Sequence, residues 1–371
     1  MKIVVFETED WERNAFTPLK DSHDVLFADG PLTCETASLY ADAEAVSVFI
    51  YSGLNRQVLE NLPRLRLVAT RSTGYDHIDA AYCRQHDITV CNVPSYVENT
   101  VAEHVFGLLL AISHHLCEAF DRTRRGDFSM AGLQGFDLRG KTMGVIGTGR
   151  IGLCVIRIAK GFGMNVLATD IRQDLAERDR LGFRYVDMET LLGASDIVTL
   201  HVPANEQTRN LLSTHEFRHM KRGSVLINTA RGSVVDVEAL LHALTEGPLL
   251  AAGLDVLPEE PAIREEAELL SSLYNRRNNV ETLLADHVLL RLRNVFITPH
   301  SAFNTREAIL RILDTTVGNI RCFAKGEPQN VLNGTANGGL KEKATGGLPA
   351  SRPPVRQPQK QSTPLDGMDH A

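Results

Sequence analysis

At 371 residues the chain is longer than one ordinary hydrophobic core, so we expect two domains with a cleft between them. Hydrophobic residues make up 43% and charged residues 23%, as is usual for a globular protein. The formal net charge of −7 is spread without long runs of one sign, which argues against a protein that binds nucleic acid or a membrane surface. A small molecule is therefore the expected partner.

The cysteines and the N-terminus bear on the cellular compartment. The six cysteines contain no CxxC pair and no spacing typical of a disulfide framework or a zinc site. The apolar run at residues 3–6 is too short for the core of a signal peptide, and acidic residues follow it. No other stretch is long and apolar enough to span a bilayer. We expect a cytoplasmic protein that contacts neither membrane nor nucleic acid.

Short apolar runs alternate with helical patterns from the start of the chain. Runs of this length separated by helices are typical of a parallel sheet with helices on both faces. A long amphipathic helix is then predicted over residues 97–120, with a domain boundary at its start. The five runs that precede this helix lie at residues 3–6, 25–28, 46–51, 67–70 and 88–91.

A second series of strands follows the long helix and suits a doubly wound nucleotide-binding sheet. A last helix over residues 305–323 is expected to return to the first sheet. We therefore assign residues 1–100 and 301–332 to one domain and 101–300 to another. Residues 333–371, rich in Gly, Pro, Gln, Lys, Ser and Thr, are expected to form a disordered tail. The strands of the second series are predicted at residues 142–146, 165–169, 197–201, 224–228, 250–255 and 295–298.

The first strand of the second series runs into the sequence GTGRIG, a GxGxxG pattern that opens a helix. In a dinucleotide-binding turn, Gly147 permits the tight turn, Gly149 lets the backbone approach a pyrophosphate, and Gly152 lets the helix pack close to the strand. The phosphates would lie at the helix N-terminus. Asp170 ends the next strand, near the spacing at which an acid binds the adenosine ribose and repels the extra phosphate of NADP. We predict NAD as the cofactor, although Arg172 nearby would weaken that preference.

Three charged side chains each follow a strand of the second series. Arg231 lies in NTARG, Glu260 in DVLPEEP and His300 in TPHSAF. Because the carboxyl ends of parallel strands face the ligand crevice, these side chains can converge on one site. Taken singly, each has an ordinary alternative as a surface cation, a solvated acid or a packed histidine. Together they supply a bidentate cation for a carboxylate, a general acid/base and an acid beside it, as interconversion of a 2-hydroxy acid and a 2-oxo acid requires.

Residues 215–219 read HEFRH, which matches the HExxH pattern of zinc proteases. A zinc protease needs both histidines on a long helix, whereas Ser213 and Glu216 form a capping-box pattern that starts a short one. Phe217 and Met220 are expected to occupy the buried face. We predict that no metal binds here.

The GxGxxG, NTARG, DVLPEEP and TPHSAF segments occur in one order and together resemble the D-isomer-specific 2-hydroxyacid dehydrogenase family, over residues 1 to about 332. The resemblance implies an α/β fold with a flavodoxin-like substrate domain and a Rossmann NAD-binding domain. It also implies that Arg231 orients the substrate, Glu260 supports the histidine and His300 is the general acid/base. The NAD contacts that it implies are Arg150, Ile151, Asp170, Val202, Pro203, Thr208, Thr229, Ala230, Arg231 and Asp255.

The loop RSTGYDHID at residues 71–79 resembles the D-lactate dehydrogenase branch of this family. The resemblance implies that backbone amides near Thr73 and Gly74 hold the substrate carboxylate. Tyr51 and Phe303 stand where that branch has aromatic pocket residues, and ordinary packing is an equal alternative for both. The family also implies a homodimer formed through the nucleotide domain.

Two other functions stay open at this point. Phosphite dehydrogenases resemble this family, whereas Glu260 argues against formate dehydrogenases, in which a glutamine takes the place of the acid. NAD-sensing corepressors keep the same fold and can retain the three charged residues. The lack of a basic patch or a recognisable nuclear signal favours an NAD-dependent enzyme that interconverts a D-2-hydroxy acid, such as D-lactate or a bulkier acid, and its 2-oxo acid.

Overall fold

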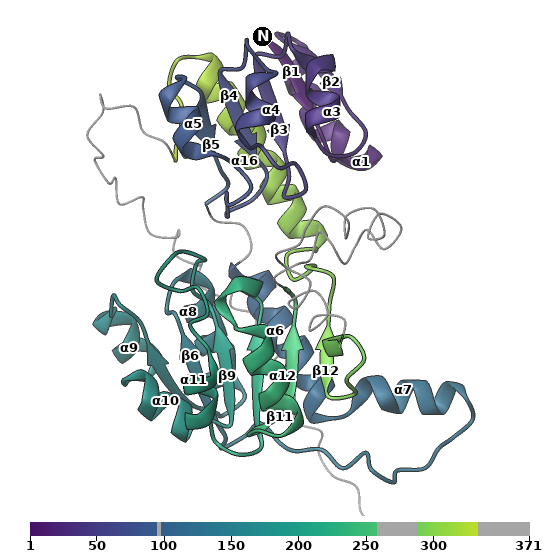
Figure 1. Ribbon diagram of the computed structural model, residues 1–371, viewed down its shortest axis with the longest axis vertical. Helices are drawn as coiled ribbons and strands as arrows, with labels where there is room; N and C mark the ends of the chain where they lie inside the picture. The colour runs from purple at the N-terminus through teal and green to yellow at the C-terminus, as the bar shows by residue number, and fades with distance from the viewer. Residues whose placement is uncertain (95–97, 258–287, 333–371) are drawn as a thin grey trace, which may run out of the picture. The chain divides into compact units, whose positions relative to one another are not determined.

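The computed structural model describes residues 1–94, 98–257 and 288–332, and two parallel sheets organise these residues (Figure 1). The first sheet has the order β2-β1-β3-β4-β5, which is the flavodoxin-like order. All five of its predicted strands form, although β3 ends three residues before Tyr51. The predicted tail at residues 333–371 lies outside the described residues. The strands of this sheet are β1 (Lys2–Val5), β2 (Asp24–Phe27), β3 (Ala45–Val48), β4 (Leu67–Thr70) and β5 (Thr89–Cys91).

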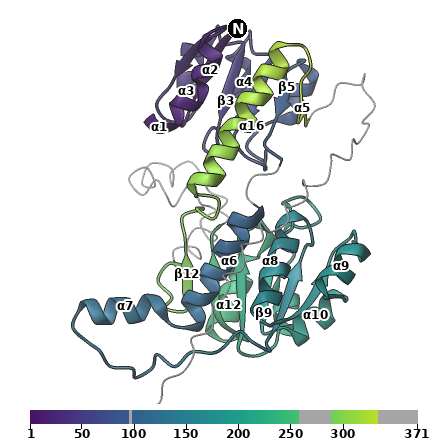
Figure 2. The same cartoon turned by 180° about the vertical axis from the view of Figure 1, so that it is seen from behind.

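Both faces of the first sheet are buried because its strands alternate their apolar side chains between two layers. Val4 and Val68 face a cluster that includes Leu59 of α4, whereas Ile3 faces a cluster that includes Leu313 of α16. Figure 2 shows α16 lying along this sheet, as the sequence predicted for the last helix. The helices of this part are α1 (Asp10–Arg13), η1 (Asn14–Phe16), α2 (Thr17–Lys20), α3 (Cys34–Ala37), η2 (Ser38–Tyr40), α4 (Arg56–Glu60), α5 (Ala80–Gln85) and α16 (Arg306–Ala324).

The second sheet has the order β12-β11-β10-β9-β6-β7-β8, and every pairing that it makes is parallel. Numbered from its own first strand, the order is 3-2-1-4-5-6 with one further strand, which is the dinucleotide-binding arrangement. The sequence did not predict β8, because two residues at a sheet edge form no apolar run. The strands are β6 (Thr142–Ile146), β7 (Asn165–Thr169), β8 (Arg184–Tyr185), β9 (Ile197–Leu200), β10 (Ser224–Asn228), β11 (Leu249–Leu254) and β12 (Val295–Ile297).

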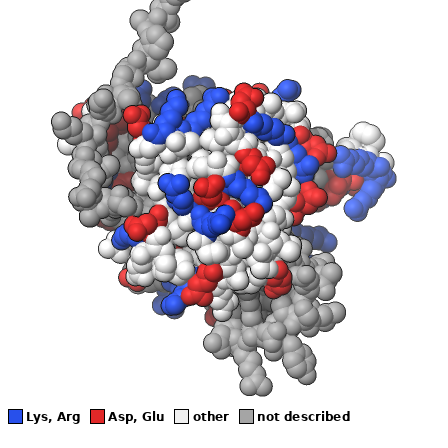
Figure 3. Space-filling view, turned by 90° about the horizontal axis from the view of Figure 1, so that it is seen from above, with Lys and Arg blue, Asp and Glu red and all other residues white. Residues whose placement is uncertain are grey.

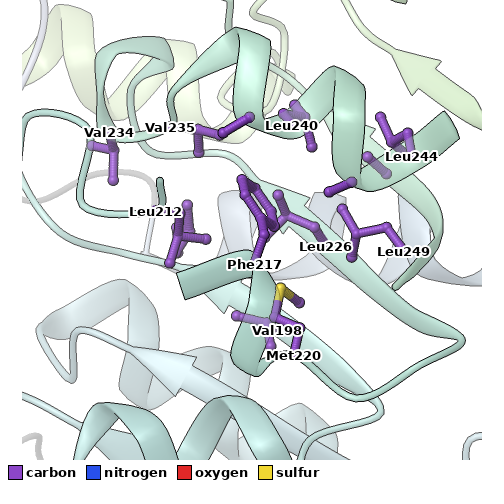
Figure 4. Close-up of a cluster of buried hydrophobic side chains, with 14 of the residues drawn as sticks. Val198, Leu212, Phe217, Met220, Leu226, Val234, Val235, Leu240, Leu244 and Leu249 are labelled. Carbon is purple, nitrogen blue, oxygen red and sulfur yellow. The ribbon is translucent and has the colours of Figure 1, made fainter. Parts of the chain in front are cut away.

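Helices cover both faces of the second sheet. Residues of α6 and α8 pack on one face with Met143 and Val145 of β6. On the other face, Phe217 of α11 and Leu240 of α12 surround Leu226 of β10 (Figure 4). The helices of this part of the chain are α6 (Glu98–Ser113), α7 (Leu116–Arg124), α8 (Arg150–Gly161), α9 (Leu175–Leu181), α10 (Met188–Ala194), α11 (Thr214–His219), η3 (Gly232–Val234) and α12 (Val237–Thr245).

The prediction of one helix over residues 97–120 is wrong, because the chain forms two helices, α6 and α7. His115 between them has φ 50°, which ends the right-handed helix, and the carbonyl of Ser113 accepts the N–H of Phe136 at 2.9 Å. Half of α6 is buried, whereas α7 buries no residue, so burial stops at the break even though apolar side chains continue into α7. Among the described residues, no single helix is long and apolar enough to cross a membrane; α6 and α7 meet that test only when taken together, and they are bent by 61°.

The charged side chains are mixed in sign on the face that Figure 3 shows. Lysine and arginine side chains lie next to aspartate and glutamate side chains there. Among the described residues, ion pairs include Lys2 with Asp42 (Nζ to Oδ2 2.6 Å) and Arg56 with Glu60 (Nε to Oε1 2.7 Å). The six cysteines are all free.

Candidate active site

The glycine-rich turn between β6 and α8 has the geometry that the sequence predicted. Gly147 has φ 95°, and a Cβ there would lie 2.6 Å from the carbonyl oxygen of His201. A Cβ on Gly152 would lie 2.1 Å from the carbonyl oxygen of Gly147, so only glycine lets the helix approach the strand this closely. Gly149, the N-cap of α8, has open space where its Cβ would stand. The backbone at the start of α8 is therefore accessible to a phosphate.

Asp170 follows β7 and is held at this turn by hydrogen bonds. Its Oδ2 accepts the N–H of Thr148 at 2.6 Å and the Thr148 hydroxyl at 3.1 Å, and its Oδ1 accepts the N–H of Arg172 at 2.8 Å. The hydroxyl of Tyr185, in β8, lies 2.8 Å from the Thr148 hydroxyl. A carboxylate fixed beside the glycine-rich turn suits the adenosine ribose and opposes an added phosphate.

One cavity of about 800 Å³ gathers most of the predicted site residues. Its walls come from loops after β3, β4 and β5, from loops after β6, β9, β10, β11 and β12, and from the start of α6. Tyr51, Gly147, Gly152, Asp170 and Thr208 do not line it, and Glu260 lies outside the described residues. The predicted residues that line it are Thr73, Gly74, Gly149, Arg150, Ile151, Val202, Pro203, Thr229, Ala230, Arg231, Asp255, His300 and Phe303.

Arg231 reaches the cavity on a turn that the buried side chain of Asn228 braces. The Asn228 Nδ2 donates to the carbonyl of Arg231 at 3.0 Å, and its Oδ1 accepts the N–H of Ala230 at 3.0 Å. The Arg231 Nε donates to Oδ2 of Asp76 at 3.1 Å. A Cβ on Gly74 would stand 1.9 Å from Nη2 of Arg231. The guanidinium thus lies directly against the loop at residues 71–79, and the sequence had suggested no role for Asn228 or Asp76.

His300 lies on a turn that the carboxylate of Asp255 holds. The backbone of His300 has φ 51°, a left-handed conformation that is rare for a residue with a side chain. Asp255 is buried, and it accepts the Thr298 hydroxyl at 2.6 Å and the N–H groups of Ser301 at 2.9 Å and Ala302 at 3.0 Å. Asp255 therefore fixes the backbone on both sides of His300.

The pKa of Asp255 is lowered in this setting. Burial raises it, but hydrogen bonds from His104, Thr298, Ala302 and Ser301 outweigh the burial. The His104 Nε2 lies 3.4 Å from Oδ1 of Asp255 and 3.0 Å from the Thr298 hydroxyl. The carboxylate is therefore charged at neutral pH and anchors the His300 turn to α6.

An aromatic group forms one wall of the cavity. Phe49 lines it together with Phe303, and the two ring centroids are 5.2 Å apart. The Phe303 ring also lies 6.5 Å from the ring of His300. Tyr51 is half exposed and contacts Phe49 at 5.9 Å between centroids. The sequence did not single out Phe49, because it reads as the buried middle of a strand, whereas β3 ends one residue earlier.

Two further observations fit a bound dinucleotide. Thr229 is buried, and its hydroxyl has no hydrogen-bond partner within the described parts of the chain. Arg150, at the start of α8, pairs with Glu98 at 3.3 Å on the cavity wall. Thr208 instead donates to the carbonyl of Pro203 at 2.5 Å, which closes the loop after β9. A ligand that accepts a hydrogen bond from the Thr229 hydroxyl would give this buried group a partner.

The HExxH segment forms the six-residue helix α11. The capping box between Ser213 and Glu216 is present, and Phe217 and Met220 are buried, as predicted. The helix ends at His219, and the Nδ1 of that residue contacts the carbonyl of His215 at 2.9 Å. Across residues 1–94, 98–257 and 288–332, no group of three or more His, Cys, Asp or Glu side chains is placed to hold a metal ion.

The chain is similar to several known proteins. The D-isomer specific 2-hydroxyacid dehydrogenase NAD binding domain matches residues 106–302. The D-lactate dehydrogenase of Escherichia coli (strain K12) is 35% identical over 334 residues, which cover 88% of this chain and 98% of that protein. A glyoxylate reductase of Korarchaeum cryptofilum is 37% identical over 298 residues, 79% of this chain and 83% of that protein.

Solved structures give the same result. The D-lactate dehydrogenase of Aquifex aeolicus complexed with NAD and lactic acid has a TM-score of 0.78 and 32% identity, covering 90% of this chain and all of that chain. The apo-structure of the Escherichia coli D-lactate dehydrogenase has a TM-score of 0.76 and 34% identity with the same coverage. The chain therefore belongs to the D-isomer-specific 2-hydroxyacid dehydrogenase family and contains its NAD-binding domain.

Proposed function

We propose that this protein interconverts a D-2-hydroxy acid and its 2-oxo acid, D-lactate and pyruvate or a bulkier pair, with NAD as the cofactor. The observation that carries the proposal is that Arg231, His300 and the start of α8 line one cavity. A cation for the carboxylate, a proton donor and acceptor, and a dinucleotide-binding turn thus share one space. The relatives described above are named for D-lactate and for glyoxylate, a 2-hydroxy acid and a 2-oxo acid. These names favour this function over that of a phosphite dehydrogenase or an NAD-sensing corepressor.

Each residue has a role in this proposal. The planar guanidinium of Arg231 binds the substrate carboxylate through two parallel hydrogen bonds, together with backbone amides near Thr73 and Gly74. His300 takes the hydroxyl proton during oxidation and returns it to the carbonyl oxygen during reduction. Glu260 supports His300, a role that rests on the family resemblance alone.

The cofactor residues complete the proposal. The pyrophosphate of NAD is held by Gly149, Arg150 and Ile151, and its adenosine ribose is bound by Asp170. The loops around Val202 and Thr229 hold the rest of the NAD molecule. Bound NAD supplies the hydride acceptor or donor. Thr208 would act through the loop that it closes rather than from the cavity wall.

The test is NADH oxidation with a panel of 2-oxo acids from glyoxylate and pyruvate to phenylpyruvate, repeated with NADPH. His300→Ala should lower kcat by about 10² to 10⁴ if it is the general acid/base. Arg231→Lys should lower kcat/KM, because lysine keeps the charge but loses the planar fork. Full activity of His300→Ala would reject its role, and tight NADH binding without turnover of any 2-oxo acid would favour the phosphite or sensing function.

We also propose a homodimer formed through the NAD-binding part of the chain, in the cytoplasm. Exposed apolar side chains of α7 and the segment after it support the dimer: Phe120, Phe128 and Met130 are 59%, 80% and 86% exposed. Light scattering after size-exclusion chromatography tests it. Phe120→Lys with Phe128→Lys should give a monomer, and a wild-type chain that elutes as a monomer would reject the proposal. Cell fractionation tests the location.

A further inference from the structure

We propose that Glu7 is a positioning residue for the substrate pocket, because its carboxylate fixes the loop after β3 that carries Phe49 into the cavity. The inference rests on the proposed function, since it takes the cavity beside Phe49 as the place of the 2-oxo acid side chain. Glu7 lies just after β1, does not line the large cavity and has no role in the proposed chemistry.

Three hydrogen bonds join the carboxylate of Glu7 to this loop. Its Oε2 accepts the N–H of Phe49 at 2.7 Å and the hydroxyl of Ser52 at 2.6 Å. Its Oε1 accepts the N–H of Tyr51 at 2.8 Å. The Ser52 hydroxyl in turn accepts the N–H of Leu32 at 2.9 Å. The Glu7 carboxylate thus accepts the N–H groups of both Phe49 and Tyr51, which follow the end of β3. The conformation of this loop therefore depends on both oxygens of the carboxylate.

The backbone of Glu7 is itself held in an unusual conformation. Its φ is 52°, a left-handed value that is rare for a residue with a long side chain. Its carbonyl accepts Nη2 of Arg71 at 2.6 Å, and the same nitrogen binds the carbonyl of Phe6 at 2.6 Å. Arg71 is 3% exposed, and burial lowers its pKa to about 10, so it is still a cation at neutral pH. A strained residue held by a buried cation points to a function for the conformation.

Packing alone does not hold Phe49 on the side away from the substrate. A second cavity, of about 370 Å³, lies there and is lined by Glu7, Trp11, Arg71, Phe49 and Phe303. Phe49 and Phe303 line both cavities, so this aromatic pair separates them. With space behind the rings, Phe49 is held in the wall by its ring contacts with Tyr51 and Phe303 and by the hydrogen bond from its N–H to Glu7.

The test compares Glu7→Gln with wild type in NADH oxidation, using glyoxylate, which has no side chain, and phenylpyruvate, which has a large one. A glutamine has one acceptor oxygen, so it leaves Tyr51 or Phe49 without its acceptor. The ratio of kcat/KM for phenylpyruvate to that for glyoxylate should fall about 10-fold, the size of a lost contact in an apolar pocket. The dissociation constant of NADH, measured by fluorescence, should not change.

Glu44→Gln is the matched control. The Glu44 carboxylate also accepts a main-chain N–H, that of Lys2 at 2.8 Å, but it stands at the start of β3, at the opposite end from Phe49. This variant should keep the wild-type ratio. A purely structural role for Glu7 would lower activity on both substrates alike and leave the ratio unchanged, which would overturn the inference.

Glu7→Asp provides a second variant if Glu7→Gln does not fold. It keeps the charge but is one methylene shorter, so it cannot reach both amides, and the ratio should fall in the same direction. If Glu7→Asp folds and its ratio of kcat/KM for phenylpyruvate to that for glyoxylate equals that of an active wild type, the inference is wrong but the proposed function stands. A wild-type protein that turns over no 2-oxo acid would instead overturn the proposed function, and this inference with it.

Discussion

Replacing Asp255 with asparagine tests how the His300 turn is held. Besides its hydrogen bond with His104, the carboxylate accepts three hydrogen bonds from the turn itself, from the Thr298 hydroxyl and from the N–H groups of Ser301 and Ala302. An asparagine has one acceptor oxygen, so its NH₂ group must face one of the two amides. A buried amide without an acceptor costs about 1 to 3 kcal/mol. We expect Asp255→Asn to lower the free energy of unfolding by about 2 kcal/mol.

The same change should impair catalysis, because the turn carries His300 in a left-handed conformation. Displacement of a reacting group by about 1 Å can cost about 100-fold in rate, so we expect kcat to fall by that order. Stability is measured by urea unfolding and kcat by NADH oxidation with the best 2-oxo acid.

Asp196→Asn is the control for Asp255→Asn. Asp196 accepts the N–H of Thr142 at 2.9 Å at the amino-terminal ends of β9 and β6 in the same sheet, whereas Asp255 follows the carboxyl end of β11, so loss of the Asp196 carboxylate should affect stability without changing kcat. If Asp255→Asn keeps both the wild-type urea midpoint and a kcat within about 2-fold of wild type, the reasoning about the turn is wrong.

Three further predictions each concern a single residue, Gly74, Asp170 or His77. Gly74→Ala should lower kcat/KM about 10-fold or more with little loss of stability, because its Cβ would displace the flexible end of Arg231, at 1.9 Å, rather than the backbone; unchanged kinetics would contradict this. Asp170→Ser should raise the ratio of kcat/KM for NADPH to that for NADH about 10-fold, since it removes the charge that opposes the extra phosphate; an unchanged ratio would exclude Asp170 from cofactor choice. Burial lowers the pKa of His77 from 6.5 to about 4, so as the pH falls the unfolded chain binds a proton before the folded chain does. The free energy of unfolding should therefore decrease as the pH falls from 6.5 to 4, by up to about 3 kcal/mol. His77→Asn should remove that part of the loss in urea titrations from pH 7 to pH 4, and an unaltered profile would show that another group causes it.

The strands were predictable because both sheets are parallel and buried on two faces. Their sequences are short continuous apolar runs such as those of β4 and β6, which flanking turns delimit on both sides. The break between α6 and α7 was not predictable in the same way. The apolar period continues past His115, and what ends the helix is a tertiary contact, the hydrogen bond from Phe136 to the carbonyl of Ser113.

The place of Arg231 and His300 on the cavity wall was predictable, because both stand in linear motifs at strand ends. What holds their turns was not predictable. Asn228 was not singled out, and Asp255 was expected only as an NAD contact, whereas both form hydrogen bonds with the neighbouring turns. The role of Glu7 could not be predicted from the sequence for a further reason. It acts on a loop more than 40 residues along the chain, and its left-handed backbone has no sequence signal of its own in a glutamate.

The place of α16 has a consequence for biosynthesis. This helix supplies Leu313, Val317 and Ile320 to one apolar face of the first sheet, whose last strand ends at Cys91. Translation must proceed a further 233 residues, from residue 91 to residue 324, before that face can be covered. At about 5–20 residues per second this takes roughly 12–47 s. During that interval the nascent N-terminal strands expose an apolar surface that the chain itself cannot yet cover.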